Sequence, residues 1–304
     1  MRAQVRIVIA GGSFGGLATA YELRRRLSPE RTEITLLASD HQFRFVPSFP
    51  WVAMGRRNLE QISFDLAAPL ARKQVVFAHE TVTAVDTDAK VVTTTCAEHP
   101  YDFLVVATGH RSAKEAVPGL GPVDGPGHSP MSAEETTELA GAIRSLLAEP
   151  GPVVVGAAPG ASCIGPVYEL AFELDQLLRQ RRLRHHVPIT LLTPEPFLGH
   201  MGMGGAGTIR QLLEAALEER DIAYRTSVAI TKISAEAVEA EGLRPTPSVC
   251  SIVIPPLVGV EAIAASPGLS NPKGFVPVDD HVRHEAPHNR VGMKGLHRQA
   301  VAAA

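Results

Sequence analysis

Residues 5–10 (VRIVIA) form a short apolar run rich in β-branched side chains, which leads directly into GGSFGG at residues 11–16 and a helix-forming stretch at 17–27. A strand, a glycine turn and a helix in this order are typical of a dinucleotide-binding unit, because the turn lets backbone N–H groups approach a pyrophosphate. Ser13 replaces the middle glycine of G-x-G-x-x-G, but the strand–helix junction is the context that the motif requires. We therefore predict a dinucleotide site at Gly11, Gly12, Ser13, Phe14, Gly15 and Gly16. The alternative is an ordinary turn of a nucleotide-free α/β protein.

Composition limits the classes of protein to which the chain can belong. Its 304 residues suggest two domains or one large one, and 45% hydrophobic residues allow a large core. A net charge of −3 and 5% aromatic residues argue against nucleic-acid binding. No apolar run approaches the ~20 residues that span a bilayer, and no signal peptide precedes the first strand, so we expect a cytoplasmic protein. Three cysteines without C-x-x-C spacing predict neither a disulfide scaffold nor a metal site.

The first half of the chain continues as a dinucleotide-binding unit. A second strand at 34–37 is followed by Ala38, Ser39 and Asp40, where an acidic residue usually binds the adenosine ribose. The nearest acid, Asp40, comes later than that pattern expects. We expect a loop at 43–51, a small meander of strands at 75–77, 81–85 and 90–95, and a buried strand at 101–107 that ends in Ala107, Thr108 and Gly109.

The second half repeats the opening pattern. Four glycines and four prolines at 116–130 predict an interdomain linker, followed by a helix at 133–147, a strand at 152–155, a turn at 156–161 and a helix at 168–181. Residues 189–192 (ITLL) repeat residues 34–37. Ala158 and Ala161 replace the glycines that close approach to NAD would need, so a nicotinamide site and a plain scaffold both stay open. We further expect an amphipathic helix at 208–220 with an apolar stripe, and strands at 252–254 and 275–278, with no strand after residue 285. The stripe comprises Ile209, Leu212, Leu213, Ala216 and Leu217.

Six segments resemble the sulfide:quinone oxidoreductases and flavocytochrome sulfide dehydrogenases, a family of flavoproteins with two dinucleotide domains. They are GGSFGGLATAYEL, FRFVPSFPWVAMG, YDFLVVATG, GPVVVGAAPGASCIGPVYEL, EPFLGHMGMGGAG and NPKGFVPVDDHVRH, within residues 5–284. The resemblance implies an α/β fold of two Rossmann-like dinucleotide-binding domains. An FAD domain at 1–115 would be joined by 270–304, and the second domain would be 116–269. It also implies FAD contacts from Pro47 and Val82, besides the glycine turn, residues 38–40 and residues 107–109.

The same resemblance implies that a cysteine near the flavin takes up sulfide sulfur, while two electrons pass to FAD and on to a quinone. Cys163 matches that cysteine, and its place near a helix N-terminus is expected to lower the thiol pKa. The alternative is a small residue packing a helix on a sheet. Glu169, expected in the first turn of the helix, matches a family glutamate that could move protons. His200 matches a histidine near the active site. An ordinary helix-stabilising glutamate and a solvated loop histidine are the alternatives.

The chain also departs from this family. Met131 and Glu135 stand where sulfide:quinone members have a cysteine and a histidine, whereas Cys96 and Cys250 match no family cysteine. The second flavin-side cysteine, the quinone pocket and the membrane-associating C-terminal helices have no counterpart. We interpret the loss of pattern after Arg283 as a truncated or frameshifted reading, which would leave a sheet edge unpaired. With Cys163 alone unable to close a polysulfur bridge, we expect little or no sulfide:quinone turnover.

Three functions therefore remain open. The first is a sulfide-oxidising flavoenzyme with sulfide and a quinone as substrates, cytoplasmic or peripheral at the membrane. The second is an NAD(P)H-dependent flavin reductase, in which Glu195 would read the ribose after the strand at 189–192. The third is a non-catalytic flavin-binding remnant.

Overall fold

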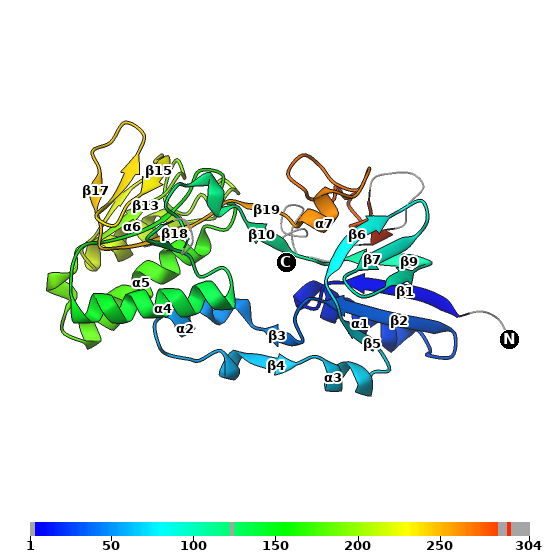
Figure 1. The fold of residues 1–304 in the computed structure, drawn as a ribbon. Coiled ribbons are helices and arrows are strands. Elements are labelled where there is room, and N and C mark those ends of the chain that lie inside the picture. Colours follow the sequence, from blue (N-terminus) through cyan, green and yellow to red (C-terminus); the bar gives the residue numbers. More distant parts are fainter. Residues whose placement is uncertain (1–3, 122–124, 285–290, 293–304) are drawn as a thin grey trace. The chain divides into compact units, whose positions relative to one another are not determined.

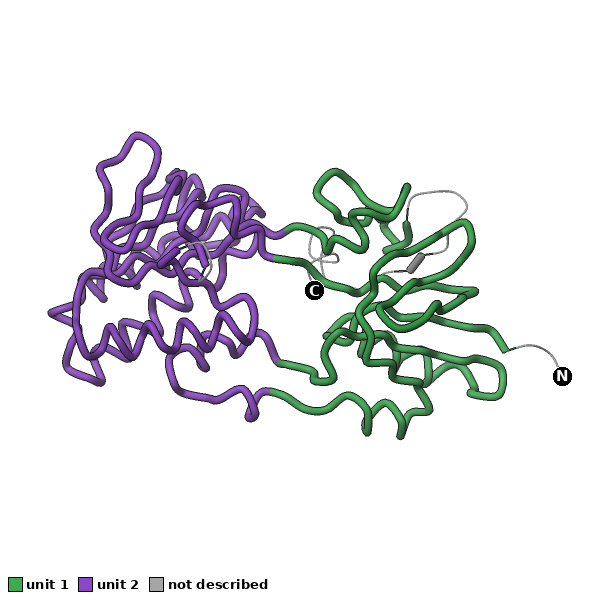
Figure 2. The backbone as a smooth tube through the Cα atoms, in the orientation of Figure 1, with its two compact units in different colours: residues 1–44, 63–111, 258–304 green, residues 45–62, 112–257 purple. Residues whose placement is uncertain are grey.

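The chain folds into two compact units (Figure 1, Figure 2). The structure is a computed structural model that describes residues 4–121, 125–284 and 291–292. Unit 1 comprises residues 1–44, 63–111 and 258–304, and unit 2 comprises residues 45–62 and 112–257. The sequence predicts domain boundaries after residues 115 and 269, whereas the units change at 111 and 257. The structure also assigns residues 45–62 to unit 2.

Unit 1 is organised around a parallel sheet in the order β20-β9-β1-β2-β5. Its strands are β1 (Val5–Ala10), β2 (Thr32–Ala38), β5 (Val76–His79), β9 (Phe103–Val106) and β20 (Val291–Gly292). The strands are near-continuous apolar runs because a parallel sheet is covered on both faces. Successive crossovers run from β1 out to β2 and β5 on one side, and the chain returns to β9 on the other. The strand order therefore reverses between β1 and β9, which is where open α/β sheets bind ligands.

The remaining elements of unit 1 surround this sheet. They are helices α1 (Phe14–Arg26), α3 (Ala67–Arg72) and α7 (Glu261–Ala264), the antiparallel pair β3 (Gln42–Arg44) and β4 (Ser63–Asp65), and the meander β6 (Val82–Asp86), β7 (Val91–Thr94) and β8 (Glu98–Pro100). The predicted meander is wrong in one strand. β5 pairs in parallel with β2, from Thr35↔Val76 to Ala38↔His79, and so belongs to the main sheet.

Two predictions near the C-terminus are wrong. Residues 275–278 form no strand, and Val278 makes only an isolated bridge to His284. Conversely, β20 lies beyond residue 285 and pairs in parallel with β9, at Val291↔Leu104 and Gly292↔Val105. The sequence predicted an unpaired sheet edge, whereas the outer edge of β9 pairs with β20. Residues 285–290 and 293–304, on which the interpretation of lost pattern also depends, lie outside the described residues.

Unit 2 contains a second parallel sheet, in the order β11-β18-β12-β13-β14. Its strands are β11 (Gly127–His128), β12 (Val153–Ala157), β13 (Ile189–Leu192), β14 (Ile222–Arg225) and β18 (Cys250–Ile254). The order again reverses, here between β12 and β18. The predicted linker at 116–130 is wrong in part, because β11 lies within it and pairs with β18 at Gly127↔Ser251. The two parallel sheets confirm the predicted α/β class.

Helices α2 (Phe49–Ala53), α4 (Ala133–Ala148), α5 (Gly165–Gln180) and α6 (Ile209–Glu219) complete unit 2, with an antiparallel sheet of β15 (Ile230–Ile233), β16 (Ala237–Ala240) and β17 (Thr246–Pro247). Leu170, Leu174 and Leu178 of α5 are fully buried in the same core as β12. Strands β10 (His110–Ser112) and β19 (Leu257–Gly259) pair where the chain changes unit.

Two further expectations need correction. Residues 43–51 are not simply a loop: they contribute to β3, a 3-10 turn at Val46–Ser48 and α2, because Pro50 is compatible with the first turn of a helix. The stripe of α6 is only partly used. Leu217 is fully buried, but Leu212 is 65% exposed.

Candidate functional site

Two glycines of the turn after β1, Gly11 and Gly16, are packed too closely to carry a β-carbon. Gly11 has a φ of +119° and donates its N–H to the carbonyl of Leu37 at 2.8 Å. A β-carbon on Gly11 would lie 2.0 Å from the Ala107 carbonyl oxygen, and one on Gly16 would lie 1.8 Å from the Gly11 oxygen. The ends of β1 and β9 and the start of α1 therefore meet at the point where the strand order reverses, as a pyrophosphate-binding turn requires.

The N-terminus of α1 is suited to an anion. The first i→i−4 hydrogen bond of α1 is donated by the N–H of Leu17 to the Ser13 carbonyl at 2.9 Å. The N–H groups of residues 14–16 therefore lie at the open N-terminal end of the helix. Ser13 is the N-cap and makes no side-chain capping bond, and the first turn contains no acidic residue. The positive end of the helix dipole is thus not neutralised by the helix itself. Phe14 packs edge-on against Phe43 at a centroid distance of 5.0 Å.

The end of β2 is held by contacts that the sequence did not reveal. The carbonyl of Ala38 accepts from the N–H of Glu80 at 2.9 Å, and Nε2 of His79 hydrogen-bonds to the carbonyl of Ser39 at 3.1 Å. Asp40 accepts from the N–H of Gln42 at 2.9 Å and pairs with the Arg44 guanidinium. A ribose hydroxyl at Asp40 would share the carboxylate with these partners. Local sequence could not place His79 beside Ser39, because the two are 40 residues apart.

The other predicted cofactor residues divide between the units. Ala107 donates its N–H to the Ala10 carbonyl at 2.7 Å, and Thr108 and Gly109 follow, with Gly109 at a φ of +74°. Val82 begins β6, half-buried against a core cluster of unit 1. Pro47 is exposed in the 3-10 turn at Val46–Ser48 and belongs to unit 2. Unit 1 alone therefore assembles residues 11–16 with residues 107–109, and it contains every predicted cofactor contact except Pro47.

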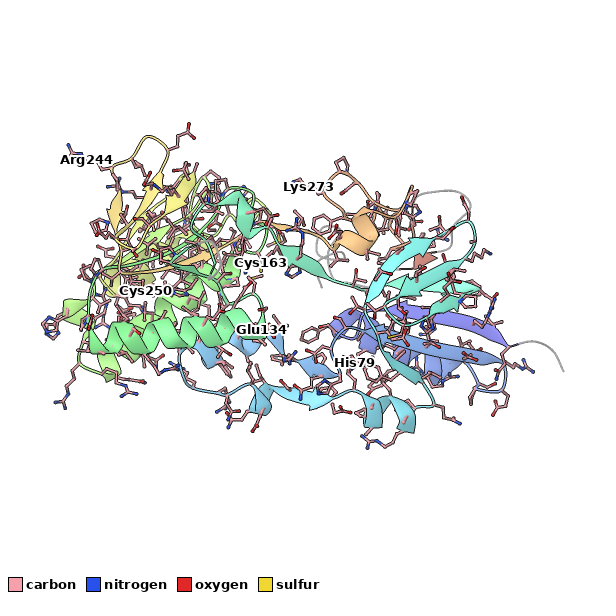
Figure 3. All side chains as sticks on the ribbon, in the orientation of Figure 1. His79, Glu134, Cys163, Arg244, Cys250 and Lys273 are labelled. Atoms are coloured by element: carbon pink, nitrogen blue, oxygen red, sulfur yellow. The ribbon has the colours of Figure 1, made fainter. Side chains whose placement is uncertain are left out.

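Cys163 lies in the turn after β12, two residues before α5 begins at Gly165 (Figure 3). The side chain is exposed, yet nearby protein atoms displace enough water to raise the pKa of the Cys163 thiol above its ordinary value. The expectation of a lowered thiol pKa is therefore wrong. Desolvation disfavours the charged thiolate, and it is the cause of the raised pKa of this thiol.

Glu169 lies in the second turn of α5 rather than the first, because the helix begins three residues earlier than expected and carries Pro166 in its first turn. It is half-buried. Burial, and then repulsion from Glu173 one turn further on, raise the pKa of the Glu169 carboxyl. Glu173 itself pairs with Arg56 at 2.8 Å. A carboxyl of this kind retains its proton closer to neutral pH than an exposed glutamate does.

His200 lies in the loop after β13, between two backbone N–H groups that bond to buried side chains. The Gly199 N–H donates to the Tyr168 hydroxyl at 2.9 Å, and the Met201 N–H donates to Oε1 of Glu195 at 2.7 Å. Glu195 is 5% exposed. The interpretation of Glu195 as a ribose reader is therefore wrong, since its carboxylate faces the interior and is already bonded. Sequence reasoning missed Tyr168 altogether.

Met131 and Glu135 form part of a polar junction at the start of α4. The Met131 N–H donates to Oε2 of Glu135 at 3.2 Å, and Lys114 pairs with Oε1 at 2.8 Å. Cys250 is buried in β18, where burial raises the pKa of its thiol to about 12. Cys96 is exposed in unit 1. Within the described part of the chain, no group of three or more His, Cys, Asp or Glu side chains could hold a metal ion.

Comparison with known proteins identifies the family. Residues 5–288 match the family described as pyridine nucleotide-disulphide oxidoreductase. The chain belongs to this family. Its enzymes bind FAD, which confirms the predicted cofactor class and the predicted FAD/NAD(P)-binding fold.

Among relatives in the family, the chain is similar to a sulfide-quinone reductase of Aquifex aeolicus, with 39% identity over 265 residues, 86% of this chain and 60% of the relative. The crystal structure of sulfide:quinone oxidoreductase from Aquifex aeolicus superposes with a TM-score of 0.90 at 37% identity, over 95% of this chain and 68% of that one. These matches confirm the resemblance stated from the sequence. The chain spans less than two thirds of the length of the first relative.

A third comparison supports the fold alone. An NAD-dependent persulfide reductase from A. fulgidus superposes with a TM-score of 0.75 at 19% identity, over 95% of this chain and 53% of that one. At this identity the likeness carries no information about substrates.

Proposed function

We propose that the chain is an FAD-dependent oxidoreductase that oxidises sulfide at Cys163 and passes the electrons through FAD to a quinone. The observation that carries the proposal is the position of Cys163, in the turn at the carboxyl end of β12, where the strand order of unit 2 reverses. Ligands of open α/β sheets bind at such positions. The similarity to the Aquifex sulfide-quinone reductase supports sulfide and quinone as the substrates.

The glycine turn of unit 1 fits FAD. The crowded contact between Gly11 and Ala107 shows a turn built for close backbone approach, and the N-terminal N–H groups of α1 lack an acidic neighbour in the first turn. Residues 11–16 would hold the pyrophosphate, and Asp40 would meet the ribose. When bound, FAD accepts two electrons per sulfide oxidised.

Cys163 would form the sulfur–sulfur bond. Its thiolate and hydrosulfide give a persulfide, one proton and two electrons: Cys163–S⁻ + HS⁻ → Cys163–S–S⁻ + H⁺ + 2e⁻. An exposed side chain lets hydrosulfide reach the sulfur. The step needs the Cys163 thiolate. Because the pKa of this thiol is raised, the thiolate becomes more abundant as pH rises.

Glu169 and His200 are the groups proposed to handle protons. Burial raises the pKa of Glu169, so this carboxyl is suited to exchange a proton closer to neutral pH. His200 lies in the loop after β13, which is held by the hydrogen bond from the Gly199 N–H to Tyr168. Strand β13 pairs with β12, the strand that precedes Cys163. We assign both residues to the proton released when the persulfide forms.

The NAD(P)H-dependent alternative is weakened by Glu195. That residue is buried and bonded to Tyr168, Thr193 and Met201, so no acidic side chain is offered to a ribose at this position. If the chain were a non-catalytic flavin-binding remnant, it would bind FAD but sulfide would not reduce the flavin.

Location and partners are part of this proposal. We propose a cytoplasmic protein with peripheral membrane contact, because a quinone acceptor resides in the bilayer. Among the described residues, none of the helices is both long and apolar enough to traverse a membrane.

The test compares reductants under anaerobic conditions. Sulfide should reduce the flavin of the purified chain rapidly and NADH slowly or not at all. Cys163→Ser should abolish the sulfide reaction, whereas Cys96→Ser, a matched change at another exposed cysteine, should not. Faster reduction by NADH than by sulfide would favour the alternative, and a flavin that neither reagent reduces would favour the remnant.

A further inference from the structure

A buried hydrogen-bond network fixes the loop after β13 on both sides of His200. Oε2 of Glu195 accepts from the Tyr168 hydroxyl at 2.5 Å and from the Thr193 hydroxyl at 2.9 Å, while Oε1 accepts from the Met201 N–H at 2.7 Å. The Tyr168 hydroxyl accepts in turn from the Gly199 N–H at 2.9 Å. The two residues that flank His200 are thus tied to one tyrosine–glutamate pair.

The pair lies in the interior of unit 2. Thr193 is fully buried, and Tyr168 and Glu195 are 4% and 5% exposed. Burial and the hydrogen bond to Glu195 raise the pKa of Tyr168, so its hydroxyl remains a donor. Each oxygen of the buried Glu195 carboxyl group has a hydrogen-bond partner, as buried polar atoms require.

The loop needs such a restraint. Gly199, Gly202, Gly204, Gly205 and Gly207 all have positive φ, and so does Met201 at +48°. A glycine-rich segment has more conformations to lose on ordering than other sequences do. The His200 ring contacts Phe197 at a centroid distance of 5.1 Å and accepts at Nδ1 from the Gly202 N–H at 3.2 Å. The His200 carbonyl also accepts from the N–H groups of Met203 at 2.9 Å and Gly205 at 3.1 Å.

The network also connects this loop to the element that carries the cysteine. Tyr168 belongs to α5, which begins two residues after Cys163 and includes Glu169. β12 and β13 are neighbouring parallel strands, so the turn that carries Cys163 and the loop that carries His200 emerge at the same edge of the sheet.

We propose that Tyr168 and Glu195 are positioning residues, which hold the His200 imidazole at the sheet edge that carries Cys163. The role in catalysis rests on the proposed function, whereas the positioning itself does not. The pair touches neither substrate nor cofactor and acts through the backbone of Gly199 and Met201. Displacement of a catalytic group by about 1 Å costs up to roughly 100-fold in rate.

The experiment uses Tyr168→Phe and Glu195→Gln in the full chain, with Tyr224→Phe as the matched control at a tyrosine that is 40% exposed. Amide hydrogen exchange at Gly199 and Met201 and the NMR titration of the His200 imidazole report position. The rate of sulfide-dependent flavin reduction reports function. Tyr168→Phe should speed exchange at Gly199 about tenfold, change the His200 titration and lower the rate at least tenfold, with little change in the sulfide concentration for half-maximal rate. Tyr224→Phe should change none of these.

Unchanged exchange and an unchanged His200 titration in both variants would overturn the proposal. An altered loop with an undiminished rate of sulfide-dependent reduction would overturn the catalytic part. If the unmodified chain is not reduced by sulfide, the proposed function fails, and exchange and the His200 titration still decide the positioning. If Tyr168→Phe or Glu195→Gln unfolds globally, amide exchange accelerates throughout unit 2 and not only in this loop.

Thr193→Val is then the second variant. It removes the Thr193 hydroxyl but keeps the hydrogen bonds that the N–H groups of Gly199 and Met201 donate. The amides of Gly199 and Met201 should therefore stay protected from exchange in this variant.

Discussion

Gly11 faces the carbonyl oxygen of Ala107 so closely that a β-carbon at position 11 would lie 2.0 Å from it. The contact joins the ends of β1 and β9, where the strand order of unit 1 reverses. A φ of +119° at Gly11 adds a second reason for glycine. The same turn is where we propose that the FAD pyrophosphate binds, so Gly11 would serve both the packing of unit 1 and the proposed cofactor site.

Gly11→Ala should therefore destabilise unit 1 by roughly 2–4 kcal/mol, because both the clash and the backbone conformation oppose a β-carbon. It should also reduce the flavin content of the purified protein. Gly141→Ala is the control, since that glycine lies within α4, has no positive φ and leaves room for a methyl group. The control should stabilise slightly. Chemical denaturation and the flavin-to-protein absorbance ratio measure both effects, and equal stability of the two variants would contradict the account.

Alkylation of Cys163 should depend on pH with a midpoint above that of an ordinary thiol, about 8.5. The reason is that desolvation raises the pKa of this thiol, so the thiolate becomes abundant only at higher pH. Labelling with iodoacetamide across a pH series, followed by peptide mass spectrometry, gives the midpoint. A midpoint below pH 7 would show that the helix N-terminus prevails over desolvation.

Glu80 should make the stability of unit 1 depend on acid pH. Hydrogen bonds from Thr94 at 2.5 Å and with His99 at 2.8 Å lower the pKa of the Glu80 carboxyl. A lowered pKa in the folded state contributes stability above the unfolded value of about 4.3, and that contribution is lost as pH falls through the folded pKa. Glu80→Gln should cost about 1 kcal/mol at neutral pH, with a smaller difference below pH ~4. A difference that does not depend on pH, measured by urea unfolding, would refute this assignment.

Asp175 should be important for the stability of unit 2. It is 2% exposed and accepts from Nε of Arg179 at 2.9 Å and Nε of Arg184 at 2.7 Å. Asp175→Asn leaves two guanidinium groups without their counter-ion, and the loss should be about 3 kcal/mol. Glu214→Gln removes an exposed i,i+4 pair with Arg210 and should change the melting temperature little. Similar losses for the two variants would contradict the burial argument.

Local pattern was sufficient to predict β1, the glycine turn and β13, because each depends on the residues within one short segment. It failed where pairing across distance decides. The sequence at 76–79 suits a strand of the meander or a strand of the parallel sheet. Only its pairing with β2 shows that it belongs to the parallel sheet. Residues 291–292 are too few to show strand periodicity, yet the free edge of β9 pairs with them.

The candidate site was predictable only in part for the same reason. Cys163 and His200 were proposed from the family resemblance and stay predictions. The pKa of the Cys163 thiol depends on the protein atoms around it and was expected in the wrong direction. Glu195 looks from sequence like an acid placed for a ribose. Its actual partner, Tyr168, is 27 residues away, and no local rule connects the two.

The most direct measurement is the sulfur content of Cys163 after anaerobic sulfide, determined by peptide mass spectrometry beside the flavin spectrum. We predict one additional sulfur on the peptide that contains Cys163 for each flavin reduced, and none on the peptides of Cys96 or Cys250. Flavin reduction that leaves Cys163 unmodified, or that continues undiminished in Cys163→Ser, would contradict the central claim.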